Sequence, residues 1–172
     1  MTTPWLDDDQ RQAWVRLAAV LELLPGVLDS QLRRDAGLTH FEYFTLASLS
    51  EAPDRTWRMT TLARRTNATL PRLSHVVRRL EDRGLVERLP CPQDARATNA
   101  RLTAQGWQTL QETAPGHVAT VRHHVIDALD PEQVDQLADI AQAILGRIDP
   151  EGRLSMTGQS AEPDPAPVFN EA

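Results

Sequence analysis

The strongest constraint on the fold is a change in apolar spacing at Gly84. Before this glycine, the run TLPRLSHVVRRLEDRG repeats apolar residues every three or four positions, which predicts an amphipathic helix. After it, LVERL and RATNARL alternate in the manner of two β-strands and flank a proline-rich turn at residues 90–94. We expect both prolines around Cys91 to lie in the loop tip rather than in the ladder. A helix followed by a β-hairpin is therefore predicted in the middle of the chain.

A shorter helix precedes this unit. Thr69 is the predicted N-cap of the long helix, and Pro71 is tolerated in its first turn. Before it, a helix is predicted over about 60–66, and a short loop at Asn67 joins the two. Helix, short loop, helix and two-stranded hairpin is the order of a winged helix-turn-helix, which inserts its second helix into the major groove of DNA. The sequence thus predicts a mainly α fold with a two-stranded β wing.

Longer amphipathic helices lie before this lobe. One is predicted over residues 9–32, where Pro25 and Gly26 introduce a kink or divide it into two abutting helices. The next begins after Thr39, which forms a predicted capping box with Glu42.

Two more helices are predicted after the hairpin, over residues 103–129 and 131–148, and the first is disturbed at Pro115 and Gly116. One chain alone cannot bury the apolar stripes of its first and last helices. We therefore expect an obligate dimer.

The charge of the chain is concentrated in the lobe. Between Arg55 and Arg101, eleven arginines stand against four acids, which gives this window a net charge of +7. Since the whole chain carries −6, the remainder carries −13. A basic segment between acidic ones is typical of a nucleic-acid-binding protein. A helical adaptor that binds proteins without DNA would also fit the long helices, but it leaves this window unexplained.

The exposed face of the 69–84 helix carries donors that can reach phosphates and purine edges. Arg72 is the strongest base-contacting candidate, followed by Ser74, His75 and Arg78, although a lone surface histidine is often only solvated. Arg79 and Arg83 are expected to contact phosphates, or to pair with Glu81, Asp82 or Glu87. Outside the wing, the predicted DNA-binding residues are Arg64, Arg65, Thr69, Arg72, Ser74, His75, Arg78 and Arg79.

The wing contains an acid and an arginine two positions apart, Asp94 and Arg96. In an extended conformation they point to the same side, so the carboxylate can hold the guanidinium in one orientation. An arginine held in this way suits the narrow, negative minor groove of A·T-rich DNA. The alternative is an ordinary turn aspartate beside an unrelated exposed arginine.

From residue 9 to residue 147 the chain resembles the MarR-type transcriptional regulators, above all in RLEDRGLVER, DAR and LTAQG. The resemblance implies a homodimeric, sequence-specific regulator of double-stranded DNA, expected to be a repressor acting on a pseudo-palindromic operator. The family's wing arginine corresponds to Arg96 and its orienting acid to Asp94. The expected division is a winged-helix domain at 1–148, with a DNA-binding lobe at 55–104 and a dimerisation layer from the helices at 9–35 and 105–148.

The resemblance also implies a small aromatic or phenolic effector, bound between the dimerisation layer and the lobe. Aromatic residues available for such a site are Trp14, His40, Tyr43, Phe44 and Trp107. The simpler interpretation is that they are core aromatics, because an apolar stripe at helical spacing needs no ligand.

The sequence gives little support for a redox, catalytic or metal site. Cys91 is the one cysteine, so a redox-responsive regulator is one alternative and an inert exposed thiol at the wing tip is another. We expect Arg88 and Arg96 to be the cations nearest this thiol. His117, His123 and His124 are expected at the surface or an interface, and no convergent catalytic set accompanies them. We expect no enzyme activity, no metal and no cofactor.

The ends of the chain carry two further expectations. The N-terminal stretch begins with acids and lacks a secretory signal, and no apolar run approaches eighteen residues, so we expect a cytoplasmic protein without a membrane span. Residues 149–172 lack periodicity and carry several prolines, which predicts a disordered tail.

Overall fold

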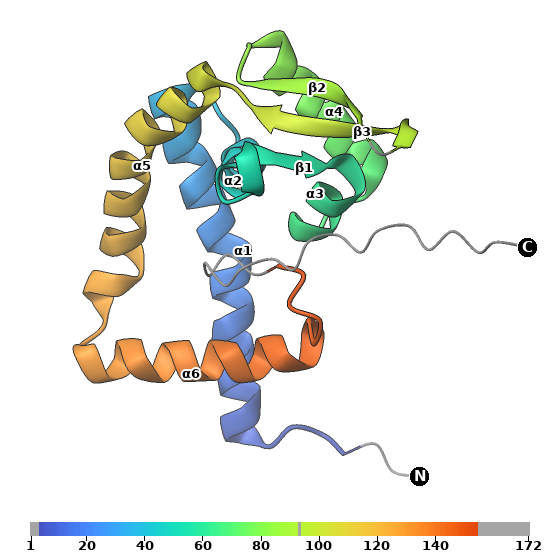
Figure 1. Cartoon of the computed structure of the whole chain (residues 1–172). Helices are drawn as coiled ribbons and strands as arrows, with labels where there is room; N and C mark the ends of the chain where they lie inside the picture. The colour runs from blue at the N-terminus through green and yellow to red at the C-terminus, as the bar shows by residue number, and fades with distance from the viewer. Residues whose placement is uncertain (1–3, 93, 155–172) are drawn as a thin grey trace, which may run out of the picture.

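The computed structural model describes residues 4–92 and 94–154, in which a small antiparallel sheet and short helices form one lobe and longer helices extend away from it (Figure 1). The described elements are α1 (Asp8–Ala36), α2 (His40–Ser50), a 3₁₀ turn (Pro53–Arg55), β1 (Thr56–Arg58), α3 (Met59–Arg65), α4 (Leu70–Asp82), β2 (Val86–Cys91), β3 (Asp94–Leu102), α5 (Ala104–His124), a second 3₁₀ turn (Ile126–Ala128) and α6 (Pro131–Ile148). The predicted winged helix-turn-helix is confirmed in α3, α4 and the β2–β3 hairpin, which is hereafter the wing.

Local capping fixes where several helices begin. Thr39 and Glu42 form the predicted capping box at α2. Thr69 caps α4 by accepting a hydrogen bond from the backbone N–H of Arg72. These caps satisfy backbone N–H groups that have no partner within the helix. Both helix starts are therefore determined by residues within one turn of the boundary.

The core of the lobe lies where α2, α3 and α4 pack against one face of the sheet. The stripe predicted for α4 is buried, and Leu73, Val77 and Leu80 are fully enclosed. Leu62 of α3 and Leu102 of β3 pack into the same cluster. Truncating one such leucine to alanine costs about 2–5 kcal/mol in proteins generally. This packing fixes which face of α4 remains exposed.

The sheet has a third strand that the sequence pattern did not reveal. β1 pairs antiparallel with β3, so the strand order is β1-β3-β2 and β2 lies at an edge. Pro90 pairs with Thr98 within the ladder, so the prediction that both prolines lie in the loop tip was wrong for Pro90. An edge strand tolerates proline because one side of it needs no hydrogen-bond donor. The pairing register shifts between Pro90 and Cys91.

The long helices are more continuous than their prolines suggested. α1 continues as one helix through Pro25, so the alternative of two abutting helices was wrong. Pro25 leaves the carbonyl of Leu21 without its usual donor, and Leu21 is itself exposed, so water can reach that turn. α5 likewise continues through Pro115 but ends at His124, earlier than the predicted position 129.

Large apolar side chains remain exposed on α1 and α6. None of the residues of α6 is buried, and Ile140 is 58% exposed. On α1, Leu21 is 60% exposed and Leu23 71%. These faces are unpartnered within the described part of one chain. Among the described helices, none is long and apolar enough to cross a membrane.

The chain after α6 is described only as far as residue 154. Residues 149–154 form a turn in which the backbone N–H of Leu154 donates to the Asp149 carboxylate at 2.8 Å. The rest of the tail predicted at 149–172 lies outside the described residues.

Candidate DNA interface

The exposed face of α4 carries most of the predicted contacts. With Leu73, Val76, Val77 and Leu80 buried, the helix leaves the side chains of Arg72, His75, Arg78 and Arg79 exposed and that of Ser74 half-buried. Leu70 and Pro71 are exposed in the first turn. The face of α4 that the sequence predicted to be exposed is therefore the face that the structure leaves exposed.

The guanidinium of Arg72, the leading base-contacting candidate, stacks on a neighbouring helix. It lies 4.3 Å from the ring centroid of Phe41 on α2. Such a cation–π contact contributes about 0.5–1 kcal/mol at an exposed site. One face of the Arg72 guanidinium is therefore already occupied by a contact within the protein.

Arg79 and Arg83 also contact the corner between α1 and α2. Nη2 of Arg79 lies 3.2 Å from Oε1 of Glu42, whose side chain is 1% exposed. Arg83 donates to the carbonyls of Ala36 and Gly37, both at 3.0 Å. These contacts attach the second half of α4 to the end of α1 and the start of α2.

The local ion pairs predicted for these two arginines do not form. The Glu81 carboxylate instead accepts from Nε of Arg88 at 2.8 Å, which holds the pKa of Glu81 below its usual value. Glu87 pairs with Arg101 across the wing at 2.8 Å. The sequence spacing suggested acids near Arg79 and Arg83 in the chain as their partners. In the fold, their partners lie on α1 and α2, far away in the sequence.

The two arginines of α3 have different surroundings. Arg65 stacks on Trp57, with the guanidinium carbon 4.5 Å from the ring centroid, and the Trp57 indole N–H donates to the carbonyl of Ser48. Arg64 is exposed in the last turn of α3. Only Arg64 of the pair presents an unstacked guanidinium there.

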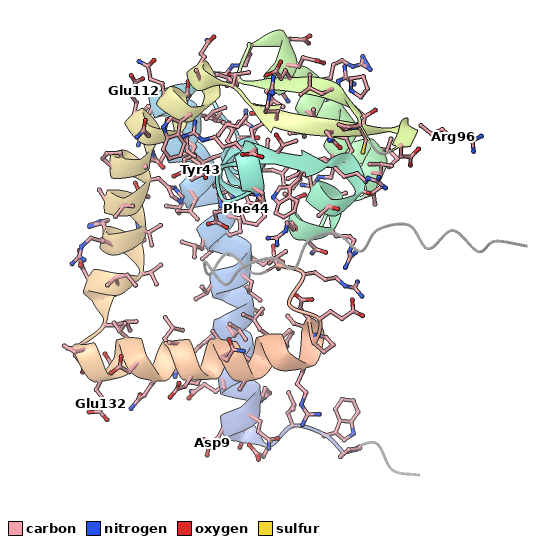
Figure 2. The ribbon with its side chains drawn as sticks, in the orientation of Figure 1. Asp9, Tyr43, Phe44, Arg96, Glu112 and Glu132 are labelled. Atoms are coloured by element: carbon pink, nitrogen blue, oxygen red, sulfur yellow. The ribbon has the colours of Figure 1, made fainter. Side chains whose placement is uncertain are left out.

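Arg96 lies at the outer end of the wing, and its side chain points away from the lobe (Figure 2). Its backbone N–H donates to the Asp94 carboxylate at 3.0 Å. The other Asp94 oxygen lies 3.9 Å from Nη2 of Arg58 on β1. Asp94 therefore orients the backbone at Arg96 and pairs with a different guanidinium. The expectation that its carboxylate holds the Arg96 guanidinium was wrong.

Most arginines of the basic window have an intramolecular partner. Within the described residues, three of their side chains make no hydrogen bond, ion pair or ring contact, and these are Arg64, Arg78 and Arg96. They come from α3, α4 and the wing. Three guanidinium groups of the basic window thus have no direct contact partner among the described residues, although Glu151 attracts that of Arg64 electrostatically.

The predicted effector residues do not form one group. The rings of Tyr43 and His117 lie 4.5 Å apart between α2 and α5, and the His40 ring lies 6.3 Å from that of His117. Burial lowers the pKa of both histidines and raises that of Tyr43. Trp14 is exposed on the first half of α1.

The other two predicted effector residues, Phe44 and Trp107, lie apart from this cluster on α2 and α5. Phe44 is half-buried on α2, next to Tyr43 in the chain (Figure 2). Trp107 is half-buried against the core and carries the Arg55 guanidinium 4.3 Å from its ring centroid. His40 and Tyr43 are thus the members of the predicted set that the fold brings to one cluster.

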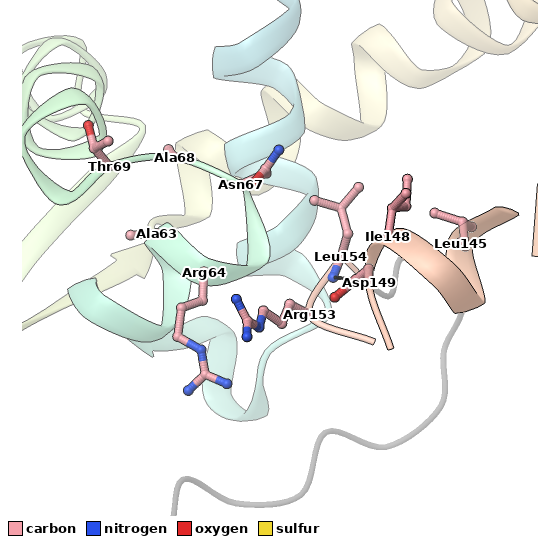
Figure 3. Close-up of a pocket in the computed structure, with 10 residues that line it drawn as sticks. All are labelled: Ala63, Arg64, Asn67, Ala68, Thr69, Leu145, Ile148, Asp149, Arg153 and Leu154. Carbon is pink, nitrogen blue, oxygen red and sulfur yellow. Dashed lines mark hydrogen bonds between the residues drawn. The ribbon is translucent and has the colours of Figure 1, made fainter. Parts of the chain in front are cut away.

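A cavity of about 430 Å³ lies elsewhere, between the loop that joins α3 to α4 and the end of α6 (Figure 3). Its lining is Ala63, Arg64, Asn67, Ala68, Thr69, Leu145, Ile148, Asp149, Arg153 and Leu154. None of the five predicted effector residues lines it. Arg64 and Thr69, both predicted to bind DNA, do.

Cys91 is buried, so the expectation of an exposed thiol at the wing tip was wrong. Nη2 of Arg58 lies 3.5 Å from its sulfur, whereas the sequence had suggested Arg88 and Arg96 as neighbours. Within the described ranges, no three histidine, cysteine, aspartate or glutamate side chains are grouped as metal ligands require.

Sequence reasoning missed the partners that hold the interface in place. Phe41 was not singled out, Glu42 was noted only as a capping residue, and Arg58 only as one of the basic residues. Its capping role alone did not indicate that Glu42 would be buried, where a carboxylate needs a cation near it. Nothing local in the sequence indicates the stack of Arg72 on Phe41.

Known proteins of one family share this fold. The model of the MarR family matches residues 38–98. The chain is 42% identical to Sco3205 from Streptomyces coelicolor, a MarR family transcriptional regulator solved in complex with DNA, over 87% of this chain and 93% of that one, with a TM-score of 0.82. It is 38% identical to AbsC, a MarR family transcriptional regulator from the same organism, over 85% of this chain and 98% of that one, with a TM-score of 0.79.

A further relative is the transcriptional repressor MprA of Escherichia coli (strain K12). The two are 34% identical over 85 residues, which is 49% of this chain and 45% of MprA. The similarity thus spans less than half of the length of that curated relative.

Proposed function

The chain belongs to the MarR family of transcriptional regulators, and from this premise we propose that it binds a double-stranded operator as a homodimer and represses transcription there. In this proposal α4 enters the major groove, and the wing reaches the adjacent minor groove. The operator is pseudo-palindromic because a two-fold dimer presents two equivalent lobes.

The observation that carries the proposal is the position of Arg96. Its guanidinium is exposed at the outer end of the wing, and its backbone is anchored through Asp94 (Figure 2). An arginine that projects from a fixed hairpin tip suits insertion into a narrow minor groove. Arg78 on α4 and Arg64 on α3, which form no hydrogen bond or ion pair among the described residues, supply further cations for base edges and phosphates.

The remaining predicted contacts have subsidiary roles in this proposal. Thr69, Ser74 and His75 face the groove from the first turns of α4. Arg65, Arg72 and Arg79 contact phosphates through the guanidinium N–H groups that their intramolecular contacts leave available. The solved DNA complex of Sco3205 and the repressor name of MprA support this assignment by similarity.

The homodimer is supported by the apolar faces that one chain leaves exposed. Trp14 and Leu21 on α1 and Ile140 and Ile148 on α6 are each more than half exposed. Burying such side chains against a second copy is favourable by about 25 cal/mol per Å². The proposed division places the DNA-binding lobe at 55–104 and the dimerisation helices at 9–35 and 105–148, within a domain of 1–148.

We propose, secondly, that a small aromatic or phenolic effector releases the DNA by binding near His40 and Tyr43. The observation in favour is an incompletely satisfied polar cluster between α1, α2 and α5. Within the described residues, Gln31 Oε1 and His117 Nδ1 are buried without a hydrogen-bond partner. A phenolic hydroxyl can donate to such an acceptor, which would favour its binding there.

A salt titration tests the main proposal. DNA fragments selected from the source genome by the purified protein are titrated at increasing salt. The logarithm of affinity should fall steeply and linearly with the logarithm of salt concentration, because bound phosphates release counterions. A helical adaptor without specific DNA binding would select no consistent sequence and show a shallow slope.

The redox alternative has its own test. Peroxide treatment of the protein before the titration should leave operator binding unchanged, because Cys91 is buried. Loss of binding that dithiothreitol restores would instead favour a regulator that responds through Cys91.

A further inference from the structure

Glu42 is a charged side chain in a place where capping alone does not require a charge. It is 1% exposed, and its Oε2 accepts a hydrogen bond from the backbone N–H of Thr39 at 2.7 Å. The matching capping boxes at α1 and α6 use Gln10 and Gln133 in the same position. An amide oxygen therefore satisfies this role in the same chain, and the charge of Glu42 needs another explanation.

That explanation lies on α4. Within the described residues, Oε1 of Glu42 is buried and accepts no hydrogen bond, and Nη2 of Arg79 lies 3.2 Å from it. Arg33 of α1 also attracts this carboxylate electrostatically. Taking a carboxylate out of water is unfavourable unless a cation compensates it. The pair thus favours one separation between the start of α2 and the middle of α4.

A second contact lies one turn further along α4. Arg83 donates from both terminal nitrogens to the carbonyls of Ala36 and Gly37, at the C-terminal end of α1. A cation is favourable there, because the last carbonyls of a helix lack intrahelical donors and carry partial negative charge. α4 is therefore attached to the α1–α2 corner at two successive turns of the same face.

We propose that Glu42 is a positioning residue for α4. Glu42 acts by holding Arg79 against the α1–α2 corner. This inference rests on the proposed dimeric DNA binding. In that dimer α1 belongs to the dimerisation layer, so the attachment of α4 to α1 also sets the separation of the two copies of α4. Glu42 itself touches no DNA. Its removal changes how well the two lobes match the spacing of the operator half-sites.

The test measures binding to a selected operator fragment and to the same fragment with one base pair inserted between its half-sites. The variants are Glu42→Gln, Arg79→Gln and the double variant. Glu42→Gln keeps the oxygen that accepts from Thr39, so the cap survives while the charge is lost. Thr39→Ala is the matched control, because it removes the other half of the capping box and leaves the Glu42–Arg79 contact.

We expect Glu42→Gln to bind the native fragment about tenfold more weakly than wild type, with a smaller preference over the inserted fragment. Thr39→Ala should retain both affinity and spacing preference at temperatures where it is folded. The double variant should bind no more weakly than Arg79→Gln, because Glu42 acts through Arg79. Circular dichroism and thermal melting verify that each variant is folded.

Wild-type affinity and spacing preference in Glu42→Gln would overturn the inference. So would an equal loss in Thr39→Ala, or effects of the two single variants that multiply in the double. If Glu42→Gln does not fold, Glu42→Asp decides, since it keeps the charge and a capping oxygen but shortens the reach to Arg79, and wild-type binding by it counts against the proposal. Failure of the wild type to enrich any fragment contradicts the proposed function itself.

Discussion

The Asp94 carboxylate accepts the backbone N–H of Arg96 at 3.0 Å and leaves the Arg96 guanidinium unpaired within the described residues. The acid thus stiffens the tip of the wing without neutralising the cation that the tip presents. Asp94 and Arg96 therefore have different roles. In the proposed function, Arg96 supplies a contact with DNA, and Asp94 fixes the backbone conformation from which that contact is made.

Arg96→Ala should weaken operator binding by about 1–3 kcal/mol, because the variant loses a contact in the minor groove. Fluorescence anisotropy on a selected fragment measures the loss. Arg101→Ala is the matched control, since Arg101 lies on the same strand but pairs with Glu87. Equal affinities of wild type and Arg96→Ala would exclude the wing from the interface.

Arg78→Ala should relax the sequence preference more than Arg72→Ala. Arg78 is exposed without a side-chain partner among the described residues, whereas the Arg72 guanidinium stacks on Phe41. A lost bidentate base contact costs about 1–3 kcal/mol at one base pair. Competition with single-base operator variants measures the preference. A larger effect of Arg72→Ala would restore it as the principal base contact.

If the chain forms the proposed homodimer, Leu21→Glu should convert it to a monomer or unfold it, because the variant introduces a charge into the exposed apolar face of α1. Sedimentation velocity reports the oligomeric state, and the wild-type melting temperature should rise with protein concentration. Ile140→Glu on α6 should act in the same way. A folded wild-type monomer at micromolar concentration would contradict the dimer.

The free energy of unfolding should decrease as the pH falls below about 6.5, through His40 and His117. Burial lowers the pKa of both histidines in the folded protein from 6.5, so the unfolded chain binds protons more readily. Their contribution to stability is complete above the unfolded value and is lost as the pH falls through the folded one. The carboxylate of Asp29 partly opposes the shift at His40.

Thermal melting at several values between about pH 7.5 and 5.5 measures this dependence. His117→Gln, which cannot titrate, should melt with a flatter dependence on pH. An unchanged slope in that variant would assign the pH dependence to other groups.

Features determined by neighbouring residues were predictable from the sequence. The caps at Thr39 and Thr69, the buried stripe of α4 and the hairpin after Gly84 depend on residues within a few positions of one another. Short-range spacing therefore sufficed to predict the winged helix-turn-helix and the outward face of its recognition helix.

Features determined by distant contacts were missed. β1 forms because Trp57 pairs with Ala100, far along the chain, and three residues of strand give little periodic signal. The stack of Arg72 on Phe41 likewise depends on how α2 packs beside α4. Pro90 was assigned to a loop because the sequence does not show which strand lies at the edge of the sheet.

The division of labour on α4 has an evolutionary consequence. Arg79 and Arg83 hold the helix to the α1–α2 corner, whereas Ser74, His75 and Arg78 face away from the core. Different side chains therefore carry the two tasks. In the proposed function, a new target sequence could be acquired by substitutions at the outward positions alone, while the contacts that keep α4 in place, and with them the fold of the lobe, stay unchanged.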